Sequence, residues 1–388
     1  MRSIELFSGA GGLALGLEAA GFESVALVEH NRHACATLRR NRPRWNVIED
    51  DIDNVRFREF ENIDLIAGGP PCQPFSMGGK AKGFEDHRDM FPAAVGAVRA
   101  LRPKAFVFEN VRGLTRPAFK NYVEFIRLQL SYPDFPVSPN IPWDQNLARL
   151  EKHHTSTAAG ASLAYKVTLH LADAADFGVP QRRHRVFFVG FRSDVDAKWH
   201  FPATTHHSDE LLRAQYVTAE YWDEHGVAHP PKLPGRLEKR VAGLRDVPLI
   251  RDKARWRTVR DAIRDLGDAR FPAAGVTDHF FQAGARSYPG HTGSPLDEPS
   301  KALKAGDHGV PGGENMLRHP DGEVRYFSIR EAARLQTFPD DWEFAGAWTE
   351  SMRQLGNAVP VRLAEAVVRS VATQIAPHGR RRPLQSAR

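Results

Sequence analysis

The chain opens with the stretch Arg2-Ser3-Ile4-Glu5-Leu6-Phe7-Ser8-Gly9-Ala10-Gly11-Gly12. Its first half, residues 2–7, has the short apolar pattern of a buried strand, and the glycines that follow predict a tight turn. A helical pattern then continues to about residue 20. A strand, a glycine-rich turn and a helix in this order form the first unit of an α/β fold.

Five further apolar runs alternate with helical segments and complete the predicted sheet. They lie at residues 24–28, 63–67, 105–108, 165–171 and 185–190. Alternation of this kind favours a mostly parallel sheet that is covered by helices on both faces. The expected fold class is therefore α/β, with a doubly wound sheet that is complete near residue 190.

Two regions depart from this pattern. Residues 131–160 contain four prolines within ten positions and are expected to form a surface excursion. After residue 191 the chain becomes rich in histidine, proline and arginine, which predicts a second, smaller domain.

Residues 232–264 hold eleven Lys or Arg against four Asp or Glu. Such a run is often only a solvated face, but its place in a separate segment favours a surface that binds a polyanion. Within it, Thr258 and Asp261 have the spacing of a capping box and predict a helix over 258–266.

The composition narrows the class of protein. The 388 residues carry a formal charge of +6, and no stretch is long and apolar enough to span a membrane. We therefore expect a cytoplasmic protein with a polyanionic partner. The two cysteines, Cys35 and Cys72, cannot build a disulfide framework, and no Cys or His cluster has the spacing of a zinc site. No metal is expected.

The glycine turn has the parts of a nucleotide-binding site. Gly9 and Gly11 permit close approach of the backbone to a ligand, and Glu29 stands 20 positions after Gly9 at the end of the second strand. A carboxylate so placed can bind ribose hydroxyls. The turn alone is compatible with NAD, FAD or S-adenosylmethionine, or with a purely structural role. Asp50-Asp51-Ile52 follows a further short strand and offers a carboxylate and an apolar wall to an adenine ring.

Cys72 is a candidate nucleophile. It lies in the run Gly68-Gly69-Pro70-Pro71-Cys72-Gln73-Pro74-Phe75-Ser76, just past a strand, at the edge where open α/β sheets bind ligands. Cys35, in a helical stretch, has the surroundings of a buried, inert thiol. Glu109-Asn110-Val111 ends another strand at the same edge. If the two strands are neighbours, Cys72 and Glu109 can hold a heteroaromatic ring between a nucleophile and a hydrogen-bonding acid.

Six motifs in order give the chain a close resemblance to the DNA cytosine-5 methyltransferases, in the form typical of bacterial restriction-modification enzymes. The first four are Phe7 to Gly12, Gly69 to Ser76, Glu109-Asn110-Val111 and Gln181-Arg182-Arg183-His184-Arg185. The last two are Arg330 to Pro339 and Gly356-Asn357-Ala358-Val359-Pro360. The resemblance implies transfer of a methyl group from S-adenosylmethionine to C5 of a flipped-out cytosine in a specific duplex DNA sequence.

The resemblance also implies roles for single residues. Cys72 would attack C6 of the cytosine, Glu109 would bond the ring's N3 and exocyclic amine, and Arg183 and Arg185 would contact the base and the catalytic loop. The residues expected to hold the cofactor are Phe7, Gly9, Gly11, Glu29, Asp51, Ile52, Pro71, Asn357 and Val359. Those expected to hold the DNA are Gln73, Ser76, Lys80, Lys82, Asn110 and Gln181.

The same resemblance predicts the domain organisation. Residues 1–192 would form the catalytic and cofactor-binding domain and 193–340 the target-recognition domain. Residues 341–376 would return to the catalytic domain, and 377–388 would be a disordered basic tail. The chain departs from the family at Glu5, where Asp is usual, and at His30, where an aromatic residue is common. A transfer-RNA cytosine-5 methyltransferase is the alternative, and a cognate restriction endonuclease is a further expected partner. The target sequence cannot be read from the residues.

Overall fold

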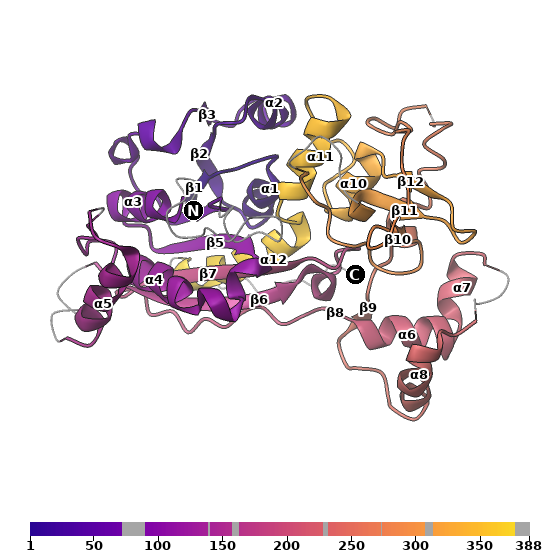
Figure 1. Ribbon diagram of the computed structural model, residues 1–388. Coiled ribbons are helices and arrows are strands. Elements are labelled where there is room, and N and C mark those ends of the chain that lie inside the picture. Colours follow the sequence, from indigo (N-terminus) through magenta and orange to yellow (C-terminus); the bar gives the residue numbers. More distant parts are fainter. Residues whose placement is uncertain are drawn as a thin grey trace.

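A seven-stranded sheet forms the centre of the computed structural model, which describes residues 1–71, 90–138, 140–156, 163–227, 232–272, 274–306 and 313–376. The strand order is β3-β2-β1-β4-β5-β7-β6 (Figure 1). The strands are β1 (Arg2–Leu6), β2 (Glu23–Glu29), β3 (Val47–Glu49), β4 (Leu65–Gly68), β5 (Ala105–Val111), β6 (Tyr165–Asp173) and β7 (His184–Arg192). The strands expected from the sequence are all present, and β5 and β7 are longer than predicted.

The sheet is mostly parallel, as expected, but one strand, β7, runs in the opposite direction. β1 to β5 pair in parallel, whereas β7 runs antiparallel to both β5 and β6. The reason lies in the connection between β6 and β7, which spans only residues 174–183. A parallel pairing needs a crossover of a dozen or more residues, so this link permits only an antiparallel pair.

Helices cover both faces, which confirms the doubly wound class. Successive side chains of a strand point to opposite faces. Phe106 and Phe108 therefore join one core cluster, and Ala105 and Val107 join another. The first cluster lies under α3 (Phe91–Leu101), α4 (Lys120–Ser131) and α5 (Trp143–His154). The second lies under α1 (Gly12–Ala19) and α12 (Val361–Ile375), and α2 (Arg32–Asn41) covers the sheet near β2 and β3.

The region 131–160 is more than a surface excursion. It contains α5, whose Leu147 and Leu150 are buried in the same core cluster as Phe125 of α4. Trp143 at the start of α5 packs edge-on against Tyr122. The prolines concealed this helix because they all precede it, and a helix tolerates proline at its N-terminal end. Residues 139 and 157–162 lie outside the described residues.

The second part of the chain is built from short elements. Its helices are α6 (Ser208–Tyr216), α7 (Glu220–Glu224), α8 (Glu238–Arg245) and α9 (Val259–Ile263). Its strands are β8 (His206–His207), β9 (Ala254–Arg255), β10 (Ser294–Pro295), β11 (Met316–Arg318) and β12 (Val324–Tyr326). The predicted capping box of Thr258 and Asp261 is present at the start of α9, which ends at Ile263, earlier than residue 266.

Two more helices, α10 (Ile329–Leu335) and α11 (Trp348–Asn357), connect the two parts. A third core cluster contains Leu38 of α2, Val259 of α9, Leu317 of β11 and Trp342. The second part is thus packed on the helices of the sheet, as Figure 1 also shows. Among the described residues, no helix has the length and hydropathy needed to cross a membrane. The expected tail at 377–388 lies outside those residues.

We predict that Gly16→Ala destabilises the protein, because a Cβ at Gly16 would lie 2.7 Å from Cβ of Ala364 and 2.8 Å from the backbone nitrogen of Glu365. Overpacking of this kind costs about 1–3 kcal/mol. Gly96→Ala in α3 is the matched control, because nothing lies within 4 Å of its Cβ position. That change should be neutral or stabilising by up to about 1 kcal/mol. Urea unfolding of both variants measures the difference, and equal stability would contradict the packing of α1 against α12.

Candidate active site

The carboxyl ends of β4 and β5 lie side by side. The two strands pair in parallel, with Gly68 opposite Phe108, so that Pro70 and Glu109 continue from neighbouring strand ends. The side-chain amide of Asn110 donates a hydrogen bond of 3.0 Å to the carbonyl of Pro70. The neighbouring strand ends required for Cys72 and Glu109 to act together are therefore confirmed. Cys72, Gln73, Ser76, Lys80 and Lys82 themselves lie in residues 72–89, outside the described part of the chain.

Glu109 is buried beside Arg185. Its side chain is 8% exposed and forms an ion pair with the guanidinium Nε of Arg185, whose side chain is 10% exposed. The register of β5 and β7 places Arg185 opposite Val111, two positions from Glu109 on the same face. Burial raises the pKa of Glu109, and the charges of Arg185 and Arg183 oppose that shift. A buried carboxyl with a raised pKa is suited to hold or share a proton.

Arg183 binds backbone carbonyls. Its guanidinium is fully buried and donates to the carbonyls of Leu303 at 2.8 Å, Gly356 at 2.6 Å and Ala358 at 3.0 Å. These bonds join three segments that are far apart in the sequence. The structure thus gives Arg183 a positioning role next to the Glu109–Arg185 pair, and its expected contact with the base stays a prediction.

Gln181 belongs to the same junction. Its amide donates to the carbonyl of Leu335 at 3.2 Å and accepts from the backbone nitrogen of Leu303 at 3.0 Å, and its side chain is fully buried. Two further buried amides had not been assigned a role from the sequence. Gln336 donates to the carbonyls of Leu355 and Ala358, and Asn315 bonds both backbone groups of Lys304. The only sequence signal for them is an amide residue within an apolar neighbourhood.

The glycine turn is fixed by Glu29. One carboxylate oxygen of Glu29 accepts from the backbone nitrogen of Gly9 at 2.8 Å, and the other accepts from that of Asn31 at 2.8 Å. Gly9 has a φ of 53° and nothing within 4 Å of its Cβ position, so open space adjoins the turn there. Gly11 has a φ of 90°, and a Cβ there would lie 2.8 Å from Leu38. The turn therefore needs glycine at both positions, for different reasons.

The other residues expected to bind the cofactor range from buried to exposed. Asp51 is exposed and caps a short 3-10 turn, while Ile52 is 5% exposed and packed in the core. Phe7 has a φ of 56° and is partly buried against the core. The backbone carbonyl of Val359, near the far end of the chain, approaches Gly12 closely. A Cβ atom at Gly12 would lie 2.2 Å from this carbonyl oxygen, so only glycine fits at that position. Asn357, two residues before Val359, is exposed. Pro71 is half-buried, and its carbonyl accepts from the backbone nitrogen of Met90.

These residues fit S-adenosylmethionine. Each oxygen of Glu29 has a second lone pair that can accept from a ribose hydroxyl, and the open space beside Gly9 gives a ligand access to the backbone. Asp51 is an exposed acceptor at the end of β3. Ile52 offers only a small accessible surface to an adenine ring.

Glu5 is a buried carboxyl inside the sheet. It lies in the middle of β1, is 3% exposed, and its Oε2 atom has no hydrogen-bond partner among the described residues. Burial raises its pKa well above the usual range, and the nearby Glu29 raises it further. Burial and Glu29 therefore both favour the neutral form of this carboxyl. Cys35, also buried, places its Sγ 3.3 Å from the carbonyl of Glu29, and burial raises the pKa of its thiol to about 12. This agrees with the inert role expected for Cys35.

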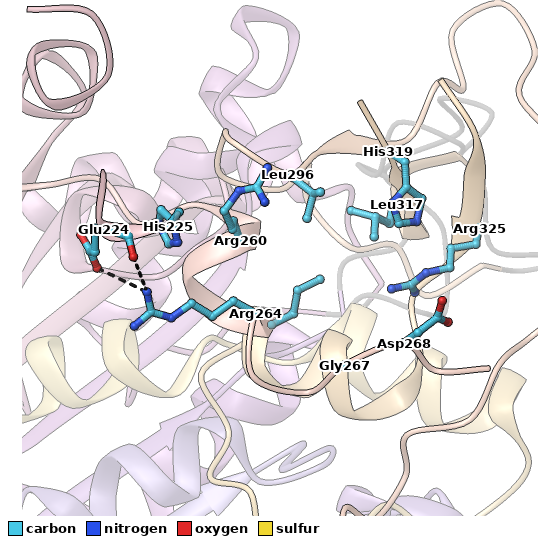
Figure 2. A pocket seen from close by; sticks show the side chains of 11 residues that line it. Glu224, His225, Arg260, Arg264, Gly267, Asp268, Leu296, Leu317, His319 and Arg325 are labelled. Carbon is cyan, nitrogen blue, oxygen red and sulfur yellow. Dashed lines mark hydrogen bonds and ion pairs between the residues drawn. The ribbon is translucent and has the colours of Figure 1, made fainter. Parts of the chain in front are cut away.

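A pocket of about 420 Å³ lies away from this edge, in the second part of the chain (Figure 2). It is lined by Glu224, His225, Arg260, Ile263, Arg264, Gly267, Asp268, Leu296, Leu317, His319 and Arg325. Glu224 and His225, together with Asp261, form the only group in the described residues that is close enough to share a metal ion. Arg255 already pairs with both carboxylates, at 2.8 Å and 2.7 Å, so its positive charge opposes a cation there.

The comparisons with known proteins bear on this geometry. The sequence model of one protein family, described as C-5 cytosine-specific DNA methylase, matches residues 1–142 and 149–373. The chain belongs to this family. It is a DNA cytosine-5 methyltransferase, and the fold, the family and the enzyme class expected from the sequence are confirmed.

The methylase is similar over its length to type II methyltransferases. It is 36% identical over 373 residues to M.PspPI of a Psychrobacter species, covering 95% of this chain and 78% of that one. It is 34% identical to M.NgoMIV of Neisseria gonorrhoeae, covering 95% and 96%. Among solved structures, a putative DNA modification methyltransferase from an E. coli prophage shares the fold with a TM-score of 0.56 and 21% identity, covering 97% of this chain and 99% of that chain.

We predict that Glu5→Gln makes the methylase more stable at about pH 8 than at about pH 5, relative to the unchanged protein. A carboxyl whose pKa is raised on folding binds its proton more tightly in the folded state, so stability falls as the pH rises from the unfolded pKa towards the folded one. Glutamine removes this loss. Urea unfolding at both pH values measures the difference in stability between the variant and the unchanged protein. Glu23→Gln, on the exposed start of β2, is the control. A pH-independent difference would contradict the burial of a titrating group.

Arg183→Met should lower the free energy of unfolding by at least about 2 kcal/mol, because each buried carbonyl that loses its donor costs about 1–3 kcal/mol. Arg183→Lys should recover part of that loss, since an ammonium group can still donate to some of the three carbonyls. Arg182→Ala is the control, because that neighbouring side chain is 57% exposed. Thermal unfolding compares the three variants, and unchanged stability of Arg183→Met would refute the junction.

Proposed function

We propose that the methylase transfers the methyl group of S-adenosylmethionine to C5 of a cytosine in a specific duplex DNA sequence, with Cys72 as the nucleophile. One observation carries this proposal. The pairing of β4 with β5 and the bond from Asn110 to Pro70 bring the start of the Cys72 loop next to the buried Glu109–Arg185 pair. A nucleophile and a proton-holding acid on neighbouring strand ends suit covalent catalysis on an electron-poor ring.

Cys72 would act as a thiolate that adds to C6 of the cytosine. Addition to C6 places negative charge on C5 and N3 of the ring. When bound, S-adenosylmethionine would supply an electrophilic methyl group, and the electron pair at C5 would form the new bond to this carbon as its bond to the cofactor's sulfur breaks. Loss of the C5 proton to solvent would then return the electron pair of the C5–H bond to the ring and expel the Cys72 thiolate. Positive charge near a cysteine favours the thiolate, and we propose that the guanidinium groups of Arg183 and Arg185 supply this charge.

Glu109 would hold a proton at N3 while negative charge develops in the ring. Burial of Glu109 supports this role, because it raises the pKa of the carboxyl and so makes it a better proton donor to a ring nitrogen than an exposed carboxyl would be at the same pH. The ion pair with Arg185 fixes the orientation of the carboxyl. Asn110, whose amide is bonded to Pro70, positions the loop that carries the nucleophile.

The cytosine must leave the duplex to be reached. Inside a base stack C6 is inaccessible, and extrusion of a base costs about a few kcal/mol. We assign contacts with the DNA to Gln73, Ser76, Lys80 and Lys82, which follow the nucleophile in the sequence. The cofactor would be held by Phe7, Gly9, Gly11, Glu29, Asp51, Ile52, Pro71, Asn357 and Val359.

We further propose that residues 1–192 form the catalytic domain, that residues 193–340 recognise the target sequence, and that residues 341–376 return to the catalytic domain. The contact of Gly12 with Val359 supports the return of residues 341–376 to the catalytic part. The relatives M.PspPI and M.NgoMIV are named type II methyltransferases, which supports a cognate restriction endonuclease with the same target. The match to a DNA methylase family favours DNA over transfer RNA as substrate.

We predict that Cys72→Ala abolishes methyl transfer and leaves cofactor binding within about twofold, because the cofactor residues lie on other segments. Methyl transfer is measured by the incorporation of labelled methyl groups into unmethylated plasmid DNA. Cofactor binding is measured by calorimetric titration with S-adenosylmethionine. Cys35→Ala is the matched control and should retain transfer, since its thiol is buried and unreactive. Transfer by Cys72→Ala would rule out the covalent route.

The substrate is tested by base-resolution mapping of 5-methylcytosine after the enzyme has acted on unmethylated genomic DNA. The expected result is methylation of one cytosine within a short recurring sequence. Incorporation of methyl groups into transfer RNA with none into DNA would refute duplex DNA as the substrate.

A further inference from the structure

A segment in the second part of the methylase exposes aromatic side chains. Phe280 is 65% exposed, Phe281 46% and Tyr288 51%, and they lie in the long loop between α9 and β10. Only one other aromatic side chain of the described residues, Phe271, is among the exposed large hydrophobic ones. Three exposed rings within nine residues suggest a surface that a partner covers.

The charge of this segment is equally unusual. No acidic residue occurs between Asp278 and Asp297, and Arg286 is exposed without an ion pair to any described residue. The basic stretch 232–264 differs, because most of its arginines already face carboxylates. Those in ion pairs are Arg236, Arg240, Arg251, Arg255, Arg260 and Arg264. An unbalanced cation among aromatic rings fits a nucleic acid, which offers both negative charge and flat bases.

Both ends of the segment are firmly held. On one side, the imidazole of His279 is buried and lies 2.8 Å from the hydroxyl of Ser328, and the carbonyl of Asp278 accepts from the backbone of Arg330 at 2.8 Å. On the other side, Tyr288 and His291 exchange two backbone hydrogen bonds and stack their rings. Anchored ends reduce the entropy that the loop loses on binding.

A short series of contacts leads from this segment to the catalytic edge. His291 and Lys304 both face the carboxylate of Glu314, at 3.7 Å and 2.8 Å. Next to Lys304, the carbonyl of Leu303 accepts from Arg183 at 2.8 Å. Arg183 in turn influences Glu109 electrostatically. The segment is thus tied to the same edge of the sheet at which the cytosine is proposed to react.

We propose that residues 280–288 read the target sequence, with Arg286 on a base edge and the rings of Phe280 and Phe281 against the bases next to the extruded cytosine. This rests on the proposed function, since extrusion of a base leaves unstacked faces that an apolar ring can cover. A guanidinium forms two hydrogen bonds to guanine in the major groove, which gives Arg286 a defined ligand. Specificity then comes from this segment, and the basic stretch 232–264 serves mainly to build the domain.

The test compares two variants with two matched controls in the full-length enzyme. The variants are Arg286→Ala and the double change Phe280→Ala with Phe281→Ala. The controls are Arg251→Ala and Leu249→Ala, whose side chains are highly exposed and lie in the basic stretch. Binding to a duplex library with a random centre is measured by selection and sequencing. Affinity for the selected duplex is then measured at several salt concentrations.

Both variants should bind the selected duplex about 5- to 100-fold more weakly, and Arg286→Ala should lose selection at one base position. The controls should bind within about twofold of the unchanged enzyme. Unchanged selection by both variants, or losses in the controls alone, would overturn the proposal. If Arg286→Ala instead keeps the base preference and lowers the slope of log affinity against log salt concentration by about one, the proposal is also overturned, because that result shows that Arg286 contacts a phosphate.

The binding readout does not depend on methyl transfer. An unchanged enzyme that selects a duplex sequence but methylates no DNA would refute the proposed function, while the variants would still decide the role of residues 280–288. Melting temperatures provide the control for folding, and exposed side chains without partners should leave them unchanged.

Discussion

The buried guanidinium of Arg183 is the interaction on which the arrangement of the methylase depends. A fully buried arginine must satisfy its donors inside the protein, and here three backbone carbonyls from two distant segments do so. Leu303 belongs to the second part of the chain, Gly356 lies in the last turn of α11, and Ala358 follows directly after that helix. One side chain at the start of β7 therefore fixes both segments against the catalytic edge of the sheet.

The same constraint explains the electrostatics of the edge. Two buried arginines and one buried carboxyl share a small volume, so the desolvation of each charge is offset only in part by its neighbours. The pKa of Glu109 is raised by burial in spite of the two guanidinium groups. The raised pKa of Glu109 is thus a consequence of the fold, and the proposed role at N3 of the cytosine uses it.

Charge pairing also distinguishes the basic stretch 232–264 from the segment around Arg286. The stretch 232–264 is the more basic one, yet many of its arginines are balanced by Asp and Glu that come from other elements, such as Asp209 and Asp297. The segment around Arg286 has a single arginine and no acid to balance it. The number of cations in a stretch therefore says less about a nucleic-acid surface than the presence of unpaired ones.

The amino-acid sequence alone determined the α/β class, the strand positions, the glycine turn with Glu29, the capping box at Thr258 and the candidates Cys72 and Glu109. These features depend on residues close together in the chain or on motifs whose order is itself informative. The antiparallel run of β7 also follows from a local feature, the short link of residues 174–183. Only the tertiary structure decided that α5 is part of the core, that Arg183 faces carbonyls and that Arg286 is unpaired. Each of these depends on partners more than a hundred residues away or on the packing of whole elements, and local patterns of hydropathy and charge carry no record of such contacts.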